Sequence, residues 1–204
     1  MEFFEAVSTL RAMRRLKPDP VPDELIWKVL GTAILAASGG NMQQWGILVV
    51  TDPAKKGKIG EWYLDAWKKS YGPRREAMRT NPATSKMYNS ADHLANNIAS
   101  VPVLIFATMP KSHVKDGGYI AGASIYPAVQ NLMLAARAVG LGTTLTTLHK
   151  LHEKDVCALL GIPDDVVTMA MIPMGWPKGN FGTPPRVPVE KVVSWETWGE
   201  KRTP

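Results

Sequence analysis

Apolar residues recur at helical intervals soon after the start of the chain. The positions that form this stripe are Leu25, Ile26, Val29, Leu30, Ala33, Ile34 and Ala37. Such spacing gives a helix one face that can be buried against a core. Pro22 suits the start of a helix, and Ser38-Gly39-Gly40 suits its end. We therefore expect an amphipathic helix over residues 23–37.

Short apolar runs further along the chain predict strands. GILVVTDP, residues 46–53, is rich in β-branched residues and closes with Asp52-Pro53. VPVLIFAT, residues 101–108, is almost wholly apolar, as in strands that are buried on both faces. TTLTTL, residues 143–148, and VVTMAMIPMG, residues 166–175, predict two more strands. These runs indicate a small sheet.

Helical segments separate the predicted strands. Residues 55–89 alternate polar and aromatic positions and predict helices with loops that line or cover something. Residues 121–139 are apolar nearly all round, so this helix must be buried. In a domain of this size, a second copy of the chain would most easily cover part of it, which predicts a dimer. A short helix over HEKDVCALL ends at Gly161. This order favours an α+β or α/β fold with the sheet between helix layers.

The last part of the chain differs from the rest. From Trp176 onward it is punctuated by Pro177, Pro184, Pro185 and Pro188 and ends in a stretch with two tryptophans. Such a tail cannot form a compact unit alone, so we expect residues 176–204 to lie across the domain or across a partner. The 204 residues, 45% of them apolar, suit one domain spanning residues 1–204.

Charge and composition narrow the class of function. The 24 Lys and Arg against 18 Asp and Glu give a net charge of +6, spread along the chain. This favours a site for a small anion over a nucleic-acid groove, and no nucleic-acid motif is present. The N-terminus does not resemble a signal peptide, and the longest uncharged run, Gly117 to Ala136, suits a buried helix better than a membrane span. We expect a cytoplasmic protein.

The sequence gives little support for a metal site or for a catalytic nucleophile. His149 and His152 are three residues apart, but no third ligand is near in sequence, so a pair at a helix start is favoured over a metal site. Cys157, the single cysteine, is expected on the apolar face of a helix as a structural residue. GLGTTL follows a helix rather than a strand, which argues against a Rossmann loop.

The remaining polar groups fit a different ligand. They are Arg11, Arg14 and Arg15; Ser38, Asn41, Gln43 and Gln44; Thr143, Thr144, Thr146 and Thr147; and Arg186. The guanidinium fork matches two phosphate oxygens, and amides can both donate to and accept from a heteroaromatic ring. Together they suggest a phosphorylated heterocyclic cofactor. Arg11 and Arg15 are four residues apart and would share one side of a helical or turn-like segment.

Four of these stretches, in this order, resemble the nitroreductase family of FMN-dependent oxidoreductases, nearly end to end. They are RAMRR, residues 11–15, with Val21-Pro22; AASGGNMQQW, residues 36–45; QNLMLAARAVGLGT, residues 130–143; and the strand and turn over residues 172–177, with an arginine further on. The resemblance implies an α+β fold with a mostly antiparallel sheet flanked by helices. It also implies an intertwined homodimer with a long buried central helix, an extended C-terminal arm and two FMN sites at the interface.

The resemblance further implies which residues contact FMN. Arg11 would face the phosphate and Arg15 the polar edge of the ring, with Ala12 and Met13 between them. Ser38 and Asn41 would reach the flavin from the partner, and Gln43 would also bind the cofactor. Leu145, Thr146 and Thr147 would pass the N5 and O4 edge, and Arg186 would clamp the phosphate.

Some positions depart from the family pattern. Met13 stands where a serine is common, Gln44 replaces a proline, and Pro184 occupies the position of a second basic residue, for which Lys178 is a candidate substitute.

By resemblance, the function is ping-pong hydride transfer through flavin N5. NADH or NADPH would be the reductant, and nitroaromatics, quinones or activated alkenes would be the acceptors. No side chain need act as an acid or base, and Arg15 would tune the flavin by stabilising negative charge on it. Three alternatives stay open: a flavin-binding sensor or carrier without turnover, a specialised dehalogenase-like or flavin-cleaving enzyme, and a nucleic-acid module. The sequence also leaves open a deazaflavin in place of either cofactor.

Overall fold

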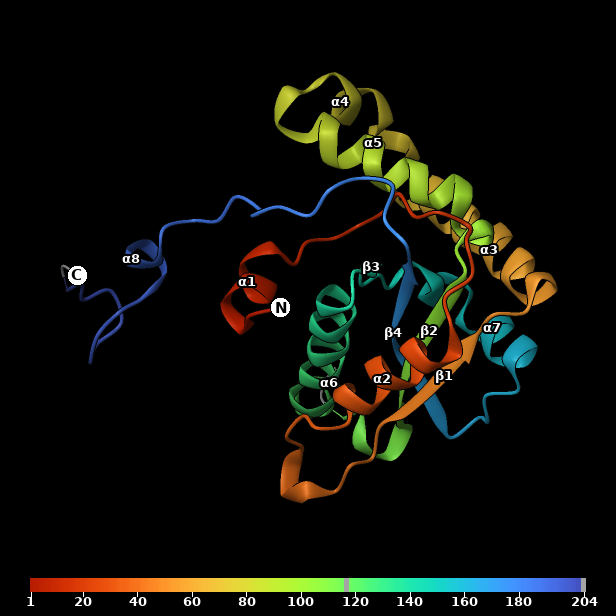
Figure 1. Ribbon diagram of the computed structural model, residues 1–204, viewed down its shortest axis with the longest axis horizontal. Helices are drawn as coiled ribbons and strands as arrows, with labels where there is room; N and C mark the ends of the chain where they lie inside the picture. Colours follow the sequence, from red (N-terminus) through yellow and green to blue (C-terminus); the bar gives the residue numbers. More distant parts are fainter. Residues whose placement is uncertain (116–117, 203–204) are drawn as a thin grey trace.

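A four-stranded antiparallel sheet forms the centre of the molecule in the computed structural model, which describes residues 1–115 and 118–202 (Figure 1). Gly117, the first residue of the uncharged run, lies outside these ranges, as do residues 203–204 at the end of the predicted C-terminal arm. The strands are β1 (Gly46–Val50), β2 (Val103–Pro110), β3 (Gly142–Thr143) and β4 (Val166–Gly175), in the spatial order β1-β2-β4-β3. The expected α+β class and antiparallel sheet are confirmed.

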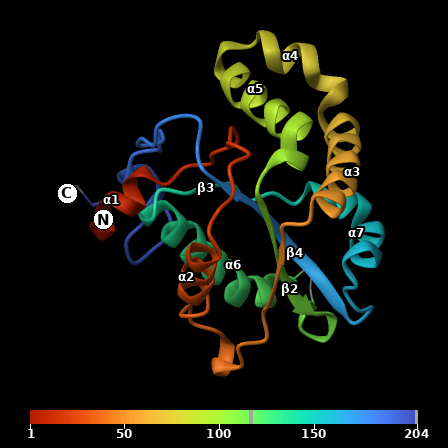
Figure 2. The same ribbon diagram turned by 45° about the vertical axis from the view of Figure 1, so that its right-hand side comes forward.

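Helices cover both faces of this sheet (Figure 2). They are α1 (Phe3–Thr9), α2 (Asp23–Ala33), α3 (Pro53–Tyr71), α4 (Arg75–Thr80), α5 (Pro82–Asn97), α6 (Tyr119–Ala138), α7 (Glu153–Leu160) and α8 (Val189–Val192). α2 and α6 pack on one face, and α3, α5 and α7 pack on the other. The polar and aromatic segment over residues 55–89 is therefore helical, as expected.

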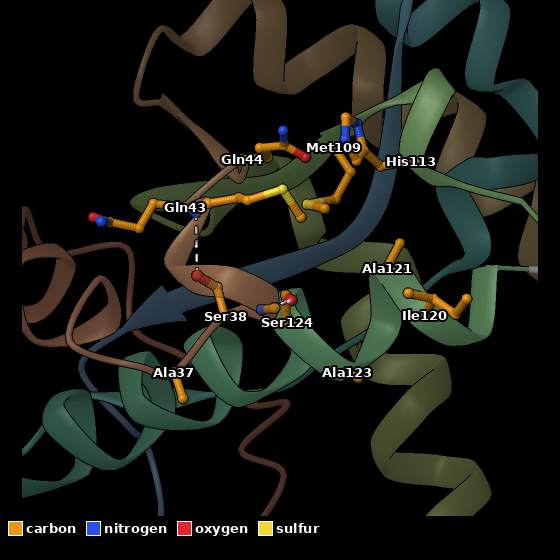
Figure 3. A pocket seen from close by; sticks show the side chains of 12 residues that line it. Ala37, Ser38, Gln43, Gln44, Met109, His113, Ile120, Ala121, Ala123 and Ser124 are labelled. Atoms are coloured by element: carbon orange, nitrogen blue, oxygen red, sulfur yellow. Dashed lines mark hydrogen bonds between the residues drawn. The ribbon is translucent and has the colours of Figure 1, made fainter.

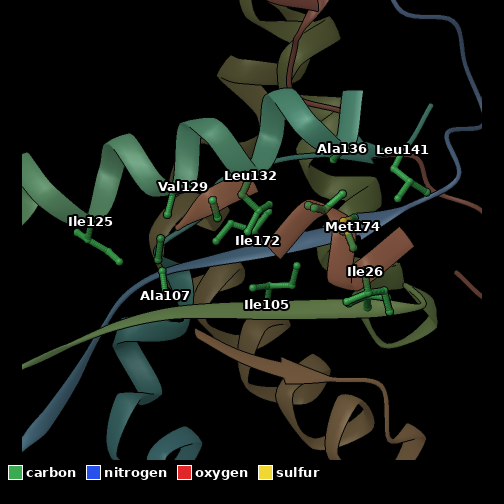
Figure 4. Close-up of a cluster of buried hydrophobic side chains, with 14 of the residues drawn as sticks. Ile26, Ile105, Ala107, Ile125, Val129, Leu132, Ala136, Leu141, Ile172 and Met174 are labelled. Carbon is green, nitrogen blue, oxygen red and sulfur yellow. The ribbon is translucent and has the colours of Figure 1, made fainter. Parts of the chain in front are cut away.

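Strand β2 supplies both halves of the core. Its side chains alternate, so that Ile105 and Ala107 point to one face while Leu104 and Phe106 point to the other. Figure 4 shows the first face, where Val129 and Leu132 of α6 pack over the sheet. Burial on both faces explains why the run over residues 101–108 is apolar without interruption.

Helix α2 ends four residues earlier than its apolar stripe predicts. After Ala33 the chain continues in tight turns, with the Leu35 nitrogen donating to Thr32 and the Ala36 nitrogen donating to Ala33. Ile34 and Leu35 are exposed in the single chain. Apolar spacing alone did not locate this helix end, because these residues do not face the chain's own core.

Most of the TTLTTL segment is not a regular strand, so the strand predicted over residues 143–148 was too long. Only Thr143 belongs to β3, and Thr146 forms an isolated bridge to Met171. Between them the chain faces Pro173 of β4, where the Thr144 nitrogen lies 3.4 Å from the Pro173 oxygen. Proline has no N–H to donate back, so the ladder is interrupted at this residue.

One side of α6 is not covered by its own chain. Tyr119 and Ile120 are strongly exposed, and Tyr126 and Pro127 are also on the surface. The opposite side of α6, with Ile125 and Leu132, is fully buried. The expectation of burial all round is therefore met on one side only within a single chain.

The chain after Trp176 forms an extended arm. It runs away from the body past α1 and contains only the single-turn helix α8 (Figure 1). Its exposed apolar residues are Val187, Val189, Val192, Val193, Trp195 and Trp198. Within residues 1–115 and 118–202, no helix is long and apolar enough to cross a membrane.

Candidate functional site

Backbone hydrogen bonds bring three of the four motif stretches together. The Met13 nitrogen donates to the Thr143 oxygen at 2.8 Å, which joins the arginine segment to β3. The Lys17 nitrogen donates to the Trp176 oxygen at 2.7 Å, and the Lys178 nitrogen donates to the Arg15 oxygen at 2.9 Å. Residues 11–17 therefore lie between β3 and the turn that follows β4.

Side chains of the arginine segment point in different directions. The segment is not helical; it is held open by these hydrogen bonds. Met13 is buried in the core, while Arg11, Ala12 and Arg15 are exposed. No carboxylate of the described residues forms an ion pair with Arg11 or Arg15. Two free guanidinium groups thus lie on one short segment, whereas the Met13 side chain is buried and its nitrogen already donates to Thr143.

Arg14 lies apart from its two neighbours. It is half-buried near Tyr63 and Tyr71 of α3. Burial lowers its pKa, and the two nearby tyrosines act in the opposite direction. This position favours a packing role for Arg14 and separates it from the exposed pair.

Gly142 fixes how closely the arginine segment approaches β3. A Cβ atom at Gly142 would lie 2.8 Å from the Met13 Cβ and 3.0 Å from the Leu16 Cδ2. Only glycine allows this approach, because a larger residue would push residues 13–16 away from the strand. The Gly in GLGT therefore has a packing function.

We expect Gly142→Ala to destabilise the fold by about 1–3 kcal/mol, the usual cost of overpacking. Chemical denaturation would measure the free energy of unfolding. Gly57→Ala is the matched control: Gly57 is inside α3, and apart from its chain neighbours and the backbone of its own helix no atom lies within 4 Å of an added Cβ. It should stabilise the helix by about 0.5–1 kcal/mol. A Gly142→Ala variant as stable as the wild type would contradict the packing argument.

The loop over residues 145–147 is anchored on both sides. Thr146 exchanges two backbone hydrogen bonds with Met171, each 2.9 Å long. Its hydroxyl lies 3.0 Å from the Tyr63 hydroxyl on α3, and burial raises the pKa of that tyrosine. Leu145 stays partly exposed, and the Thr143 hydroxyl is buried without a hydrogen-bond partner. A rigid loop with an exposed edge therefore follows β3.

Lys178 and His93 lie near Arg15. The sequence did not predict this arrangement. Lys178 is held beside Arg15 by the backbone bond, and both charges lie near His93 of α5. Burial, together with Arg15 and Lys178, lowers the pKa of His93. The structure places the backbone of Lys178 beside Arg15, and a role for Lys178 at the phosphate stays a prediction. No signal in the sequence indicates that α5 lies there.

Ser38 and Gln43 line a different cavity, of about 320 Å³, at the far end of α2 from the arginine segment (Figures 1 and 3). The Ser38 hydroxyl accepts a hydrogen bond from the Gln43 nitrogen at 3.1 Å. Asn41 lies in the same turn, where its amide oxygen accepts from Gln43 at 3.2 Å. Within one chain, these residues do not meet Arg11 and Arg15.

The turn that carries these residues has an unusual backbone. Asn41 and Gln43 have φ angles of 53° and 50°, in the left-handed region, with Gly40 beside them at 58°. A non-glycine residue in this region has a strained backbone, and such residues are frequent at ligand sites.

Arg186, the last of the predicted site residues, is on the exposed arm, where its guanidinium donates to the Pro185 oxygen.

The histidine pair and the cysteine have structural surroundings. His149 and His152 precede α7, as expected; Nε2 of His149 pairs with Thr168, and that of His152 pairs with Asp65. Residues 1–115 and 118–202 contain no group of three side chains suited to a metal ion. Cys157 is only half-buried rather than buried, and burial raises the pKa of its thiol, which disfavours the reactive thiolate.

The fold and the arrangement of motifs define a nitroreductase-like α+β protein. The chain belongs to the Nitroreductase family, whose sequence profile matches residues 8–176. The NADH dehydrogenase of Thermus thermophilus is 28% identical over 204 residues, which is 91% of this chain and 91% of that protein.

Solved structures of the same fold are similar over nearly the whole chain. Iodotyrosine deiodinase bound to FMN and 3-iodo-L-tyrosine has a TM-score of 0.76 at 22% identity, covering 97% of this chain and 100% of that one. The FMN- and NADPH-dependent nitroreductase NfnB from sphigopyxis sp. strain HMH has a TM-score of 0.74 at 19% identity, covering 97% and 100%.

Proposed function

We propose that this oxidoreductase binds FMN and uses NADPH or NADH to reduce an electron-poor small molecule. One observation carries the proposal: the segments with Arg11–Arg15, Thr143–Thr147 and Trp176–Lys178 are hydrogen-bonded into one surface, on which Arg11 and Arg15 form no ion pair with any residue that the structure describes. Family membership supports the same cofactor, because relatives of this fold are named for FMN and NADPH.

The donor set fits FMN. An anionic phosphate needs charged donors, which Arg11 supplies, and the polar edge of the ring needs a cation or amide, which Arg15 supplies. The loop over residues 145–147, anchored by the two backbone bonds between Thr146 and Met171, would present backbone groups to the edge of the ring that carries N5 and O4. When bound, FMN supplies the hydride chemistry, while the chain binds and orients it and limits access of water.

We further propose that the site is completed by a second copy of the chain. The turn over residues 38–43 follows the C-terminal end of α2, whereas the arginine segment precedes the N-terminal end, and the cavity lined by Ser38 and Gln43 includes no residue of that segment. The uncovered face of α6, with Tyr119, Ile120 and Tyr126, supplies apolar surface for a dimer. The exposed arm would then bring Arg186 to the phosphate.

We propose nitroaromatics, quinones or activated alkenes as the acceptors, and the cytoplasm as the location of the protein.

The purified protein should be yellow, and it should oxidise NADPH or NADH steadily when a quinone or a nitroaromatic compound is present. A visible spectrum and anaerobic reduction followed by an acceptor screen would test this. Bound flavin that neither nicotinamide reduces would favour the sensor or carrier instead. A colourless protein retained on DNA or RNA in a salt-sensitive way would contradict the proposal and favour nucleic-acid binding.

A further inference from the structure

Arg137 is a buried cation that no predicted role explains. It lies in the last turn of α6, and its side chain is only 9% exposed. The QNLMLAARAVGLGT stretch includes it, but the family pattern leaves that position open. A buried arginine requires partners for its charge and its donors.

Its partners come from both ends of the chain. Arg137 Nε donates to the Thr9 hydroxyl at 2.9 Å, and this hydroxyl donates in turn to the Glu5 oxygen. The Glu5 carboxylate lies 3.8 Å from a terminal nitrogen of Arg137. On its flat face, the guanidinium carbon lies 4.0 Å from the ring centre of Phe181 in the arm. A planar guanidinium can donate at its edge and stack on its face at the same time.

The two tethered segments are those that lead to the predicted phosphate ligands. Thr9 precedes Arg11 by two residues, and Phe181 precedes Arg186 by five. We infer that Arg137 is a positioning residue for the phosphate end of the flavin site, because it fixes the start of the arginine segment and the start of the arm on the buried helix α6. This inference rests on the proposed function.

The phosphate group gives a measurement that separates positioning from general stability. FMN and riboflavin differ only in the phosphate, so a residue that positions the phosphate ligands should affect FMN more. We expect Arg137→Lys to weaken FMN binding about tenfold, which corresponds to about 1.4 kcal/mol. Riboflavin binding should change by less than about twofold, because the ring contacts at Arg15 and residues 145–147 stay in place. Lysine keeps the charge but loses the edge-and-face geometry.

Two milder variants keep the inference testable if Arg137→Lys does not fold. Thr9→Val removes the accepting hydroxyl, and Phe181→Leu removes the stacked ring from a half-buried position. Each should lower the ratio of FMN to riboflavin affinity several-fold, with a melting temperature near that of the wild type. Arg79→Lys, on the exposed helix α4, is the control and should leave the ratio unchanged.

Flavin titration followed by fluorescence quenching would measure both affinities. An unchanged ratio in the folded variants, or an equal loss of both ligands, would overturn the role of Arg137. If the wild-type protein bound neither flavin, the proposed function would fail instead, so the two failures are distinguishable.

Discussion

Replacing Arg15 with alanine should weaken FMN binding roughly ten- to hundredfold, the loss expected when a charged hydrogen-bond donor is removed. The Arg15 side chain is exposed, has no ion pair among the described residues and is held in place through its backbone oxygen by Lys178. A cation at the polar edge of the ring also stabilises negative charge there. The reduction potential of the bound flavin should therefore fall in the variant.

Titration with FMN and a potentiometric measurement would test this expectation. Arg79→Ala is the matched control, because it removes an exposed arginine on α4, outside the assembled segments. Circular dichroism should show that both variants are folded, since the Lys178 contact uses only the backbone of Arg15. Unchanged affinity together with an unchanged potential would remove Arg15 from the site.

The protein should lose about 3 kcal/mol of stability as the pH falls from 6.5 to 4, through the titration of His149. Burial, and next the charge of Lys150, lower the pKa of His149 from 6.5 to about 4, and Glu153 acts in the opposite direction. The unfolded chain therefore binds a proton at a pH where the folded chain does not. Stability from this group is complete above pH 6.5 and falls with decreasing pH until the folded group also titrates.

The network around His149 explains why the neutral form is kept. The Thr168 hydroxyl donates to Glu153 at 2.7 Å and so accepts from His149 Nε2 at 2.9 Å. Nδ1 is buried without a partner, and the ring packs edge-on against Phe106. A proton on Nδ1 would have no acceptor, so the charged ring is disfavoured in the folded state.

Urea denaturation at several pH values would measure this loss. Burial alone would raise the pKa of Glu153, but hydrogen bonds from Lys150 and Thr168 outweigh it, so the pKa is lowered. Glu153 thus adds a loss of the same sign at lower pH, while His93, whose pKa burial also lowers, adds a loss in the same range as His149. Between pH 6.5 and about 5, His149→Phe should remove the larger part of the slope, whereas His113→Gln, outside the network, should keep it. A wild-type stability that is flat over this range would contradict the assignment.

The sequence by itself indicated the β2 and β4 strands closely, because both are almost wholly apolar runs that are buried on two faces. The sequence was less informative where the structure of a segment depends on the residues that pack against it from another part of the chain. The TTLTTL stretch has the composition of a strand, yet Pro173 opposite it has no N–H, and the ladder is interrupted there. The apolar stripe includes Ile34 and Ala37, yet α2 ends at Ala33 and both residues are exposed, because they do not face the core of their own chain.

For the candidate site, the sequence determined which residues carry charge and amide groups, and its motif order determined the family. Only the tertiary structure decided that Arg11 and Arg15 are exposed while Met13 is buried, because that depends on the close approach to Gly142. It also placed Lys178 beside Arg15, and Thr9 and Phe181 on Arg137. Thr9 and Arg137, and Arg15 and Lys178, are each more than a hundred positions apart, and Phe181 and Arg137 are 44 apart. Local patterns cannot specify these contacts, because they arise from the packing of the sheet and helices as a whole.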